Sequence, residues 1–237
     1  MSPASLLPPV ALLAGLLSAA NALSNGDMST RAPAHSRQAA GPSGFAVEQV
    51  LPGRRVALRA SPGGRVVARL GPRTDFGSPR TLPVEARRGP WLAVADPRLG
   101  NGRVGWLDPR AGGVQELKTP IALRIDLAHR RLELFDGGRV ERRMPIAVGA
   151  TNSPTPRGRF AVTDKLLGAD FNPAYGCCIL ALSAHQTKRP RGWTGGDRIA
   201  IHGGSTGTAS HGCVHARSRD LRYLMRRVAL GTPVFIR

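Results

Sequence analysis

The residues that could carry chemistry gather in one short stretch, Ile201-His-Gly-Gly-Ser-Thr-Gly-Thr-Ala-Ser-His-Gly-Cys-Val-His. A thiol becomes a strong nucleophile once it loses its proton, and a nearby imidazole can take that proton. His202 and His211 are both candidate bases for Cys213. Gly212, immediately before Cys213, would leave backbone N–H groups free to converge on an oxyanion. The stretch therefore predicts nucleophilic catalysis by Cys213.

Three other interpretations fit the same residue types. Cys213 could be an inert buried thiol, or it could be half of a disulfide. Zinc binding is the third alternative, because cysteine and histidine are the usual zinc ligands. The candidate ligands are His202, His211, Cys213 and His215. Their spacing does not match a common structural zinc finger, so residue chemistry favours the nucleophile but leaves all three alternatives open.

The elements that must hold this stretch are predicted to be mainly strands. The 237 residues include 29 Gly and 20 Pro, which favours turn-rich β structure. From Thr119, apolar residues alternate with others through Leu127, which is typical of a strand with one buried face. Residues 132–135 are its expected partner, and residues 140–148 continue the sheet.

One helix is expected near the C-terminus. Ser218 is a suitable N-cap, and Gly231 stands where a C-terminal cap belongs. An apolar stripe with helical spacing lies between them, formed by Leu221, Leu224, Met225 and Val228. Val234-Phe-Ile is the expected closing strand.

The N-terminal half divides into three predicted parts. Residues 1–22 are predicted to be a signal peptide, because an apolar run ends in the small-x-small pattern Ala20-Asn-Ala. Residues 23–44 are predicted to be a flexible linker. Residues 45–110 hold several short β-prone runs separated by turns, which predicts a small barrel. Residues 111–118 are predicted to link this domain to a second one at residues 119–237.

The net charge of +19 comes almost entirely from arginine, and it predicts contact with a polyanion. The arginines are scattered through both halves, and no nucleic-acid-binding signature is found. Export would place the chain in the cell envelope, outside the cytoplasmic membrane. We therefore expect anionic wall polymers or a membrane surface as partners, and not nucleic acid.

Two ordered motifs resemble the L,D-transpeptidase (YkuD-type) family. Ser210-His-Gly-Cys-Val, preceded by Ile201-His-Gly, is similar to its catalytic motif, and Thr155-Pro-Arg-Gly-Arg-Phe is similar to an upstream block. The resemblance covers residues 119–237 and implies a YkuD-type β-sandwich or barrel with a short C-terminal helix. Residues 45–110, with Val56-Ala-Leu-Arg-Ala-Ser-Pro and Gly105-Trp-Leu-Asp, resemble bacterial SH3-like domains. The fold class expected is thus mainly β.

The resemblance implies a role for each site residue. Cys213 would form a thioester with a peptidoglycan stem peptide, and His202 would move the proton, oriented by the backbone carbonyl of Gly203. Backbone N–H groups of Gly212 and Cys213, together with His211, would form the oxyanion hole, and His211 would also act in catalysis by tuning the thiolate. No cofactor or metal is implied. The residues expected to contact substrate are Ser210, His215, Arg217 and Tyr175.

The sequence departs from the family pattern in three places, one of which is a short loop between His202 and Ser210. His215 stands where the family commonly carries Arg or Asn, and Arg217 is the expected substitute for binding a substrate carboxylate. Cys177 and Cys178 are adjacent, and they are expected to be structural or linked to each other. The predicted activity is formation of 3→3 cross-links. The alternatives are an L,D-carboxypeptidase, which passes the same thioester to water, and a non-catalytic wall-binding protein.

Overall fold

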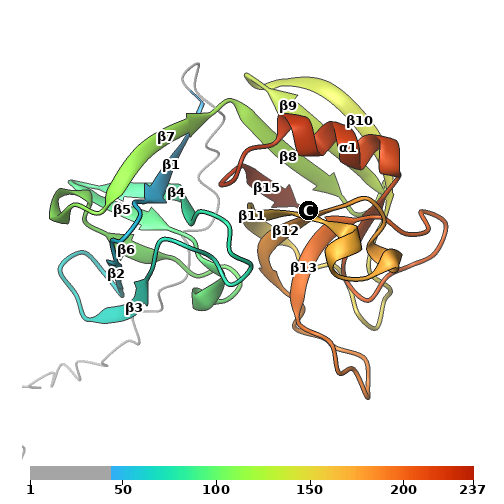
Figure 1. Ribbon diagram of the computed structural model, residues 1–237, viewed down its shortest axis with the longest axis horizontal. Helices are drawn as coiled ribbons and strands as arrows, with labels where there is room; N and C mark the ends of the chain where they lie inside the picture. The colour runs from blue at the N-terminus through green and yellow to red at the C-terminus, as the bar shows by residue number, and fades with distance from the viewer. Residues whose placement is uncertain (1–43) are drawn as a thin grey trace, which may run out of the picture.

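The computed structural model describes residues 44–237 (Figure 1). The predicted signal peptide lies outside the described residues, and so does all of the predicted linker except residue 44. Across the described residues, no helix combines the length and apolar character that crossing a bilayer requires. The described residues fold into two β units, which confirms the mainly β prediction.

The first unit is one seven-stranded sheet with the order β3-β2-β6-β5-β4-β1-β7. Its strands are β1 (Phe45–Val50), β2 (Val56–Arg59), β3 (Val66–Leu70), β4 (Thr81–Arg88), β5 (Trp91–Val94), β6 (Gly105–Leu107) and β7 (Val114–Thr119). Its core is a cluster of buried aliphatic side chains, including Leu58, Leu70, Leu82 and Leu92. Alternating side chains of β2 and β3 point into this core, as period-two burial requires.

The prediction that residues 111–118 form an interdomain linker is wrong in part. Residues 114–119 form β7, which pairs antiparallel with β1 along its full length, from Val114 opposite Val50 to Thr119 opposite Phe45. Four of its six residues are exposed, so the strand has little apolar signal. Backbone pairing to β1 holds it, and that pairing cannot be read from side-chain pattern.

The second unit is a closed barrel with the order β10-β14-β13-β12-β11-β15-β8-β9. Its elements are β8 (Ile121–Asp126), β9 (Arg131–Asp136), β10 (Arg139–Ala147), β11 (Gly158–Leu167), β12 (Cys178–His185), β13 (Arg198–His202), β14 (Val214–Ala216), α1 (Ser218–Arg227) and β15 (Pro233–Ile236). Helix α1 packs Leu221 and Leu224 into the barrel core as its apolar stripe predicts. Its N-cap is Arg217 with no side-chain cap bond, and Ser218 is the first helical residue, so that cap prediction is wrong.

Two barrel strands place the chemistry-bearing stretch. β13 and β14 run parallel, with Ile201 opposite Val214 and His202 opposite His215. The last residue of β13 therefore lies beside the start of β14, which Cys213 immediately precedes. Closing the barrel through the β10–β14 pairing holds this arrangement in place.

Candidate active site

The segment that carries Cys213 is fixed by its own hydrogen bonds. Ser210 Oγ donates to the backbone oxygen of Cys213 and accepts from the N–H of Gly212 at 3.0 Å. The backbone of Ser210 is paired on both sides, donating to Val148 at 3.0 Å and accepting from Ala150 at 2.9 Å. Ser210 is 6% exposed. Although it lines the cleft as predicted, its polar groups hold the loop and are not offered to a substrate.

Gly212 differs from its predicted role. Its N–H is taken by Ser210 Oγ, so it is not left free for an oxyanion. Glycine is required here for two reasons: φ is +118°, and a Cβ would lie 2.1 Å from Gln186 Nε2. The backbone N–H of Cys213 remains as the predicted oxyanion donor.

Two side chains that the sequence interpretation did not assign support the same loop. Thr155 Oγ1 donates to the Gly212 carbonyl at 2.8 Å and accepts from the Gly149 N–H at 2.8 Å. Gln186 Nε2 donates to the carbonyls of His211 at 2.9 Å and Pro154 at 3.1 Å. Thr155 lies in the upstream block that carried the family resemblance, which was the available signal for it. Gln186 belongs to no motif.

His202 ends β13 and is nearly buried, at 6% exposure. Its Nδ1 lies 2.6 Å from the backbone oxygen of Gly203. A carbonyl oxygen can only accept, so Nδ1 carries the proton and Nε2 keeps its lone pair. Burial lowers the pKa of His202 to about 4, with a further lowering by His215 and a smaller opposing effect from the bond to Gly203. The imidazole is therefore neutral at neutral pH and able to accept a proton.

Two aromatic rings flank this imidazole. The ring of Tyr175 lies edge-on to His202 at 4.7 Å between centroids, and the ring of His215 lies at 4.7 Å and tilted. The backbone oxygen of Tyr175 accepts from the Gly203 N–H at 2.8 Å, so the same segment orients the carbonyl that orients His202. His215 Nδ1 lies 3.1 Å from the backbone oxygen of Ser205.

The thiol of Cys213 is protonated at rest. Burial raises its pKa, and a hydrogen bond from the Ala200 backbone opposes that rise only in part. Its Sγ lies 4.0 Å from the backbone oxygen of Arg198, which a thiol can donate to weakly. With His202 neutral as well, the resting pair is thiol and imidazole and not thiolate and imidazolium.

A cleft of about 740 Å³ exposes these groups together. The predicted site residues that line it are Tyr175, His202, Ser210, His211, Cys213 and His215. His211 is exposed at the rim, where its ring lies 5.1 Å from that of Trp193. Arg217 is exposed at the start of α1 and is not among the residues that line the cleft, so its role in binding a substrate carboxylate stays a prediction.

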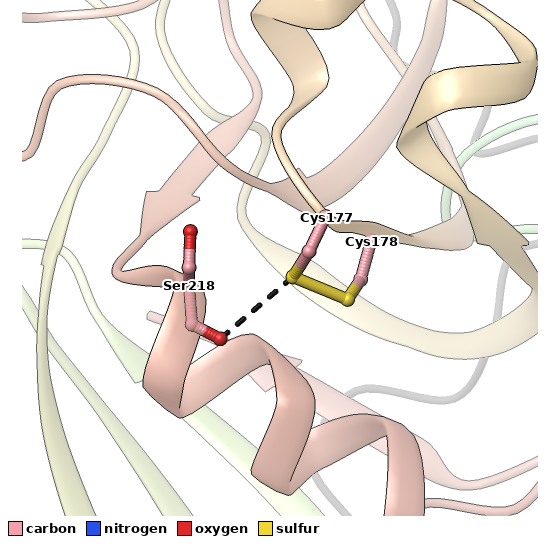
Figure 2. Close-up of a disulfide and its surroundings, with 3 residues drawn as sticks. All are labelled: Cys177, Cys178 and Ser218. Atoms are coloured by element: carbon pink, nitrogen blue, oxygen red, sulfur yellow. Dashed lines mark hydrogen bonds between the residues drawn. A yellow bond between two sulfur atoms is a disulfide. The ribbon is translucent and has the colours of Figure 1, made fainter.

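Cys177 and Cys178 form a disulfide, which confirms the expectation that they are linked to each other (Figure 2). Cys177 Sγ faces the backbone oxygen of Ser218, at the beginning of α1, at 3.7 Å. The disulfide thus lies between the Tyr175 segment and the helix. Cys213 is the free cysteine. Within residues 44–237, no three His, Cys, Asp or Glu side chains are placed to hold a metal ion, so the zinc ligand set is not assembled there.

The closed β-barrel brings a thiol and a carbonyl-tethered imidazole into one cleft, an arrangement of groups that can support nucleophilic catalysis. Residues 120–236 match the YkuD family of L,D-transpeptidase catalytic domains. The chain is also 31% identical over 159 residues to a Bacillus licheniformis protein named as a YkuD-type L,D-transpeptidase, covering 61% of this chain and 84% of that relative. The chain belongs to the L,D-transpeptidase (YkuD) family.

Solved structures similar to this chain include Bd1075 of Bdellovibrio bacteriovorus and an L,D-transpeptidase from Mycobacterium smegmatis. The first is 21% identical with a TM-score of 0.41, over 50% of this chain and 48% of the Bdellovibrio chain. The second is 19% identical with a TM-score of 0.39, over 58% of this chain and 74% of the mycobacterial chain. This chain thus spans about half the length of the Bdellovibrio structure.

Proposed function

We propose that this protein is an exported peptidoglycan L,D-transpeptidase that forms 3→3 cross-links through a thioester on Cys213. The observation that carries the proposal is the tethering of His202 Nδ1 to the Gly203 oxygen, which leaves Nε2 as a base in the cleft that holds Cys213. Membership of the YkuD family supports the substrate class, the stem peptides of peptidoglycan.

Acylation begins from the neutral pair. His202 Nε2 takes the thiol proton as Sγ attacks the carbonyl carbon of the third residue of a tetrapeptide stem. The tetrahedral intermediate is stabilised by a hydrogen bond from the Cys213 N–H to its oxyanion. It collapses to the thioester as D-alanine leaves with the proton from Nε2. Because burial disfavours both thiolate and imidazolium at rest, the charged pair forms only when a substrate carbonyl is in place.

Transfer reverses the proton path. The side-chain amine of a second stem attacks the thioester, and His202 Nε2 accepts one of its protons. The C–S bond breaks, and Cys213 recovers its proton from His202. The product is an amide between two stems. If water replaces the amine, the same steps release a shortened monomer, which is the L,D-carboxypeptidase alternative.

The side chains that we propose to contact the stem peptide include two of those expected from the sequence, Tyr175 and His215. Tyr175, His211 and His215 line the cleft, and we assign the substrate contacts to them. His215 lies opposite His202 in the β13–β14 register, and we assign it a contact with the stem peptide beside the base.

Export and a polyanionic partner remain part of the proposal. A net charge of +19 suits anionic wall polymers or lipid head groups, and the attraction is expected to weaken as salt screens it. Sedimentation with isolated walls at rising salt tests this. Binding that is unchanged between about 0.1 M and 1 M salt contradicts the electrostatic part.

The test of the chemistry is a mass measurement. Wild-type protein incubated with a carbapenem should gain a covalent adduct, and Cys213→Ala should not. The matched control is the double variant Cys177→Ser, Cys178→Ser, which keeps Cys213 and should still gain the adduct. An undiminished adduct on Cys213→Ala would overturn the nucleophile, and no adduct on wild type would favour the non-catalytic alternative. Products from wall tetrapeptides then separate dimers from shortened monomers.

A further inference from the structure

The connection between β3 and β4, residues 71–80, reaches from the N-terminal sheet to the catalytic barrel. Figure 1 shows this connection between the two units. Phe76, near its middle, lines the same cleft as Cys213 and His202. The cleft is therefore built from both units.

The connection is rigid by construction. Arg80 is buried and forms an ion pair with Asp96 at 2.5 Å. Its remaining donors reach back along the connection, to the backbone oxygens of Gly71 at 2.9 Å and Arg73 at 2.7 Å. The Thr74 N–H donates to the Ser78 oxygen at 2.9 Å and closes the turn that presents Phe76. Each nitrogen of the buried guanidinium thus donates to a partner, and these charge-assisted bonds stabilise the turn.

The N-terminal unit is also fixed to the barrel beside the cleft. Thr74 Oγ1 donates to Asp164 of β11, whose side chain is fully buried. Asn101 and His185 exchange two hydrogen bonds, at 2.7 and 2.8 Å, between the first unit and the end of β12. Glu85 and Arg159 form an ion pair at 2.8 Å across the same boundary. These contacts set the position of Phe76 relative to the barrel.

The ring of Phe76 meets two barrel residues at the cleft. It lies at 6.1 Å and edge-on to the ring of Phe171, and 5.6 Å from the guanidinium of Arg198. Arg198 is held by the Leu182 oxygen and by Thr163 Oγ1, and its own backbone oxygen is the one 4.0 Å from Cys213 Sγ. Phe76 is thus separated from the nucleophile by one residue.

Phe76 and Phe171 stay 38% and 49% exposed. Two large apolar rings left open to a cleft, beside a fixed cation, are a surface that gains free energy when an apolar part of a ligand covers it. Neither ring is needed to fill a core, since neither belongs to the core clusters of the described residues.

We propose that Phe76 is a specificity-determining residue, and that with Phe171 it forms the wall against which the apolar atoms of the donor stem peptide pack. The N-terminal unit is then part of the substrate-binding site and not only the separate domain that its SH3-like resemblance implies. This inference rests on the proposed function, because it takes the stem peptide as the ligand.

The test compares Phe76→Ala with wild type in the full chain. We expect kcat/KM for a wall tetrapeptide donor to fall about tenfold, the range for losing an apolar pocket contact. Iodoacetamide is too small to contact Phe76 while it reacts with Cys213, so the rate of Cys213 alkylation should be unchanged. Phe76→Tyr keeps the ring and should retain most of the activity. Val67→Ala, on the neighbouring β3 and away from the cleft, is the matched control.

A second measurement separates this inference from the proposed chemistry. Binding of the tetrapeptide to Cys213→Ala protein needs no turnover, and adding Phe76→Ala should weaken it about tenfold. If Phe76→Ala has native thermal stability but leaves both tetrapeptide binding and kcat/KM unchanged, the proposal that Phe76 contacts the donor stem is wrong. An equal fall in alkylation and in donor turnover would also overturn it, because Phe76 would then act on the thiol through Arg198.

Discussion

The two walls of the cleft are built in opposite ways. The barrel residues at and behind the chemistry are polar and buried: His202, Thr155 and Ser210 are each at most 6% exposed, and each has a backbone hydrogen-bond partner. The wall that includes Phe76 is apolar and open to solvent. Chemistry requires atoms held within a fraction of an ångström, whereas packing against a substrate requires only a surface of suitable shape. This difference predicts that substitutions of the buried polar residues of the barrel reduce activity strongly and that substitutions in the N-terminal wall reduce it less.

The largest effect is expected from His202→Ala. Without a base, acylation should slow by about 10²–10⁴-fold, the usual contribution of a general base. The measurement is the rate of carbapenem adduct formation at neutral pH. His129→Ala, at an exposed histidine in the β8–β9 turn, is the control and should leave the rate unchanged. A fall of less than about threefold in His202→Ala would mean that another group, such as His211, takes the proton.

A smaller effect is expected from Thr155→Val. The change keeps the shape of the side chain but leaves the Gly149 N–H and the Gly212 oxygen without their partner. We expect a loss of about 1–3 kcal/mol in the free energy of unfolding and about a tenfold slower acylation, since the loop that holds Cys213 loosens. Urea unfolding and adduct kinetics measure both. Exposed Thr151→Val in the same segment should change neither, and normal kinetics in Thr155→Val would show that Ser210 suffices to hold the loop.

The smallest effect is expected from His215→Gln and concerns pH. Acylation needs neutral His202, so its rate should fall with acid as the imidazole gains a proton, with a pKa of about 4. His215, with its ring 4.7 Å away, contributes to lowering the pKa of His202, so its removal should move this acid limb to higher pH. The pH profile of adduct formation measures the shift. A limb that stays in place, or moves down, would mean that burial alone sets the pKa of His202.

The fold was predictable where side-chain pattern carries it. The alternation from Ile121 and the stripe of Leu221 and Leu224 predicted β8 and the face of α1. β7 was not predictable, because exposed residues such as Gln115 and Lys118 give no apolar period and the strand depends on pairing with β1. The α1 N-cap was also missed, since Arg217 caps the helix by backbone conformation alone.

The site was predictable where its residues are close in sequence. Cys213, His202 and the contact to the Gly203 oxygen all lie in one stretch, and the structure has that contact. Arg217 is also close in sequence, yet it lies at the N-cap of α1 and is not among the residues that line the cleft. Proximity along the chain therefore identifies candidates without fixing where each side chain points.

The sequence by itself determined the family and the mainly β class and selected Cys213 and His202 as the candidate thiol and base, because short motifs record those without reference to distant residues. Only the tertiary structure decided what surrounds them. Thr155 meets Gly212 from 57 residues away, and Phe76 reaches the cleft from a different sheet. The protonation of the pair is also a tertiary property, because burial sets it and burial depends on every strand that closes around the site.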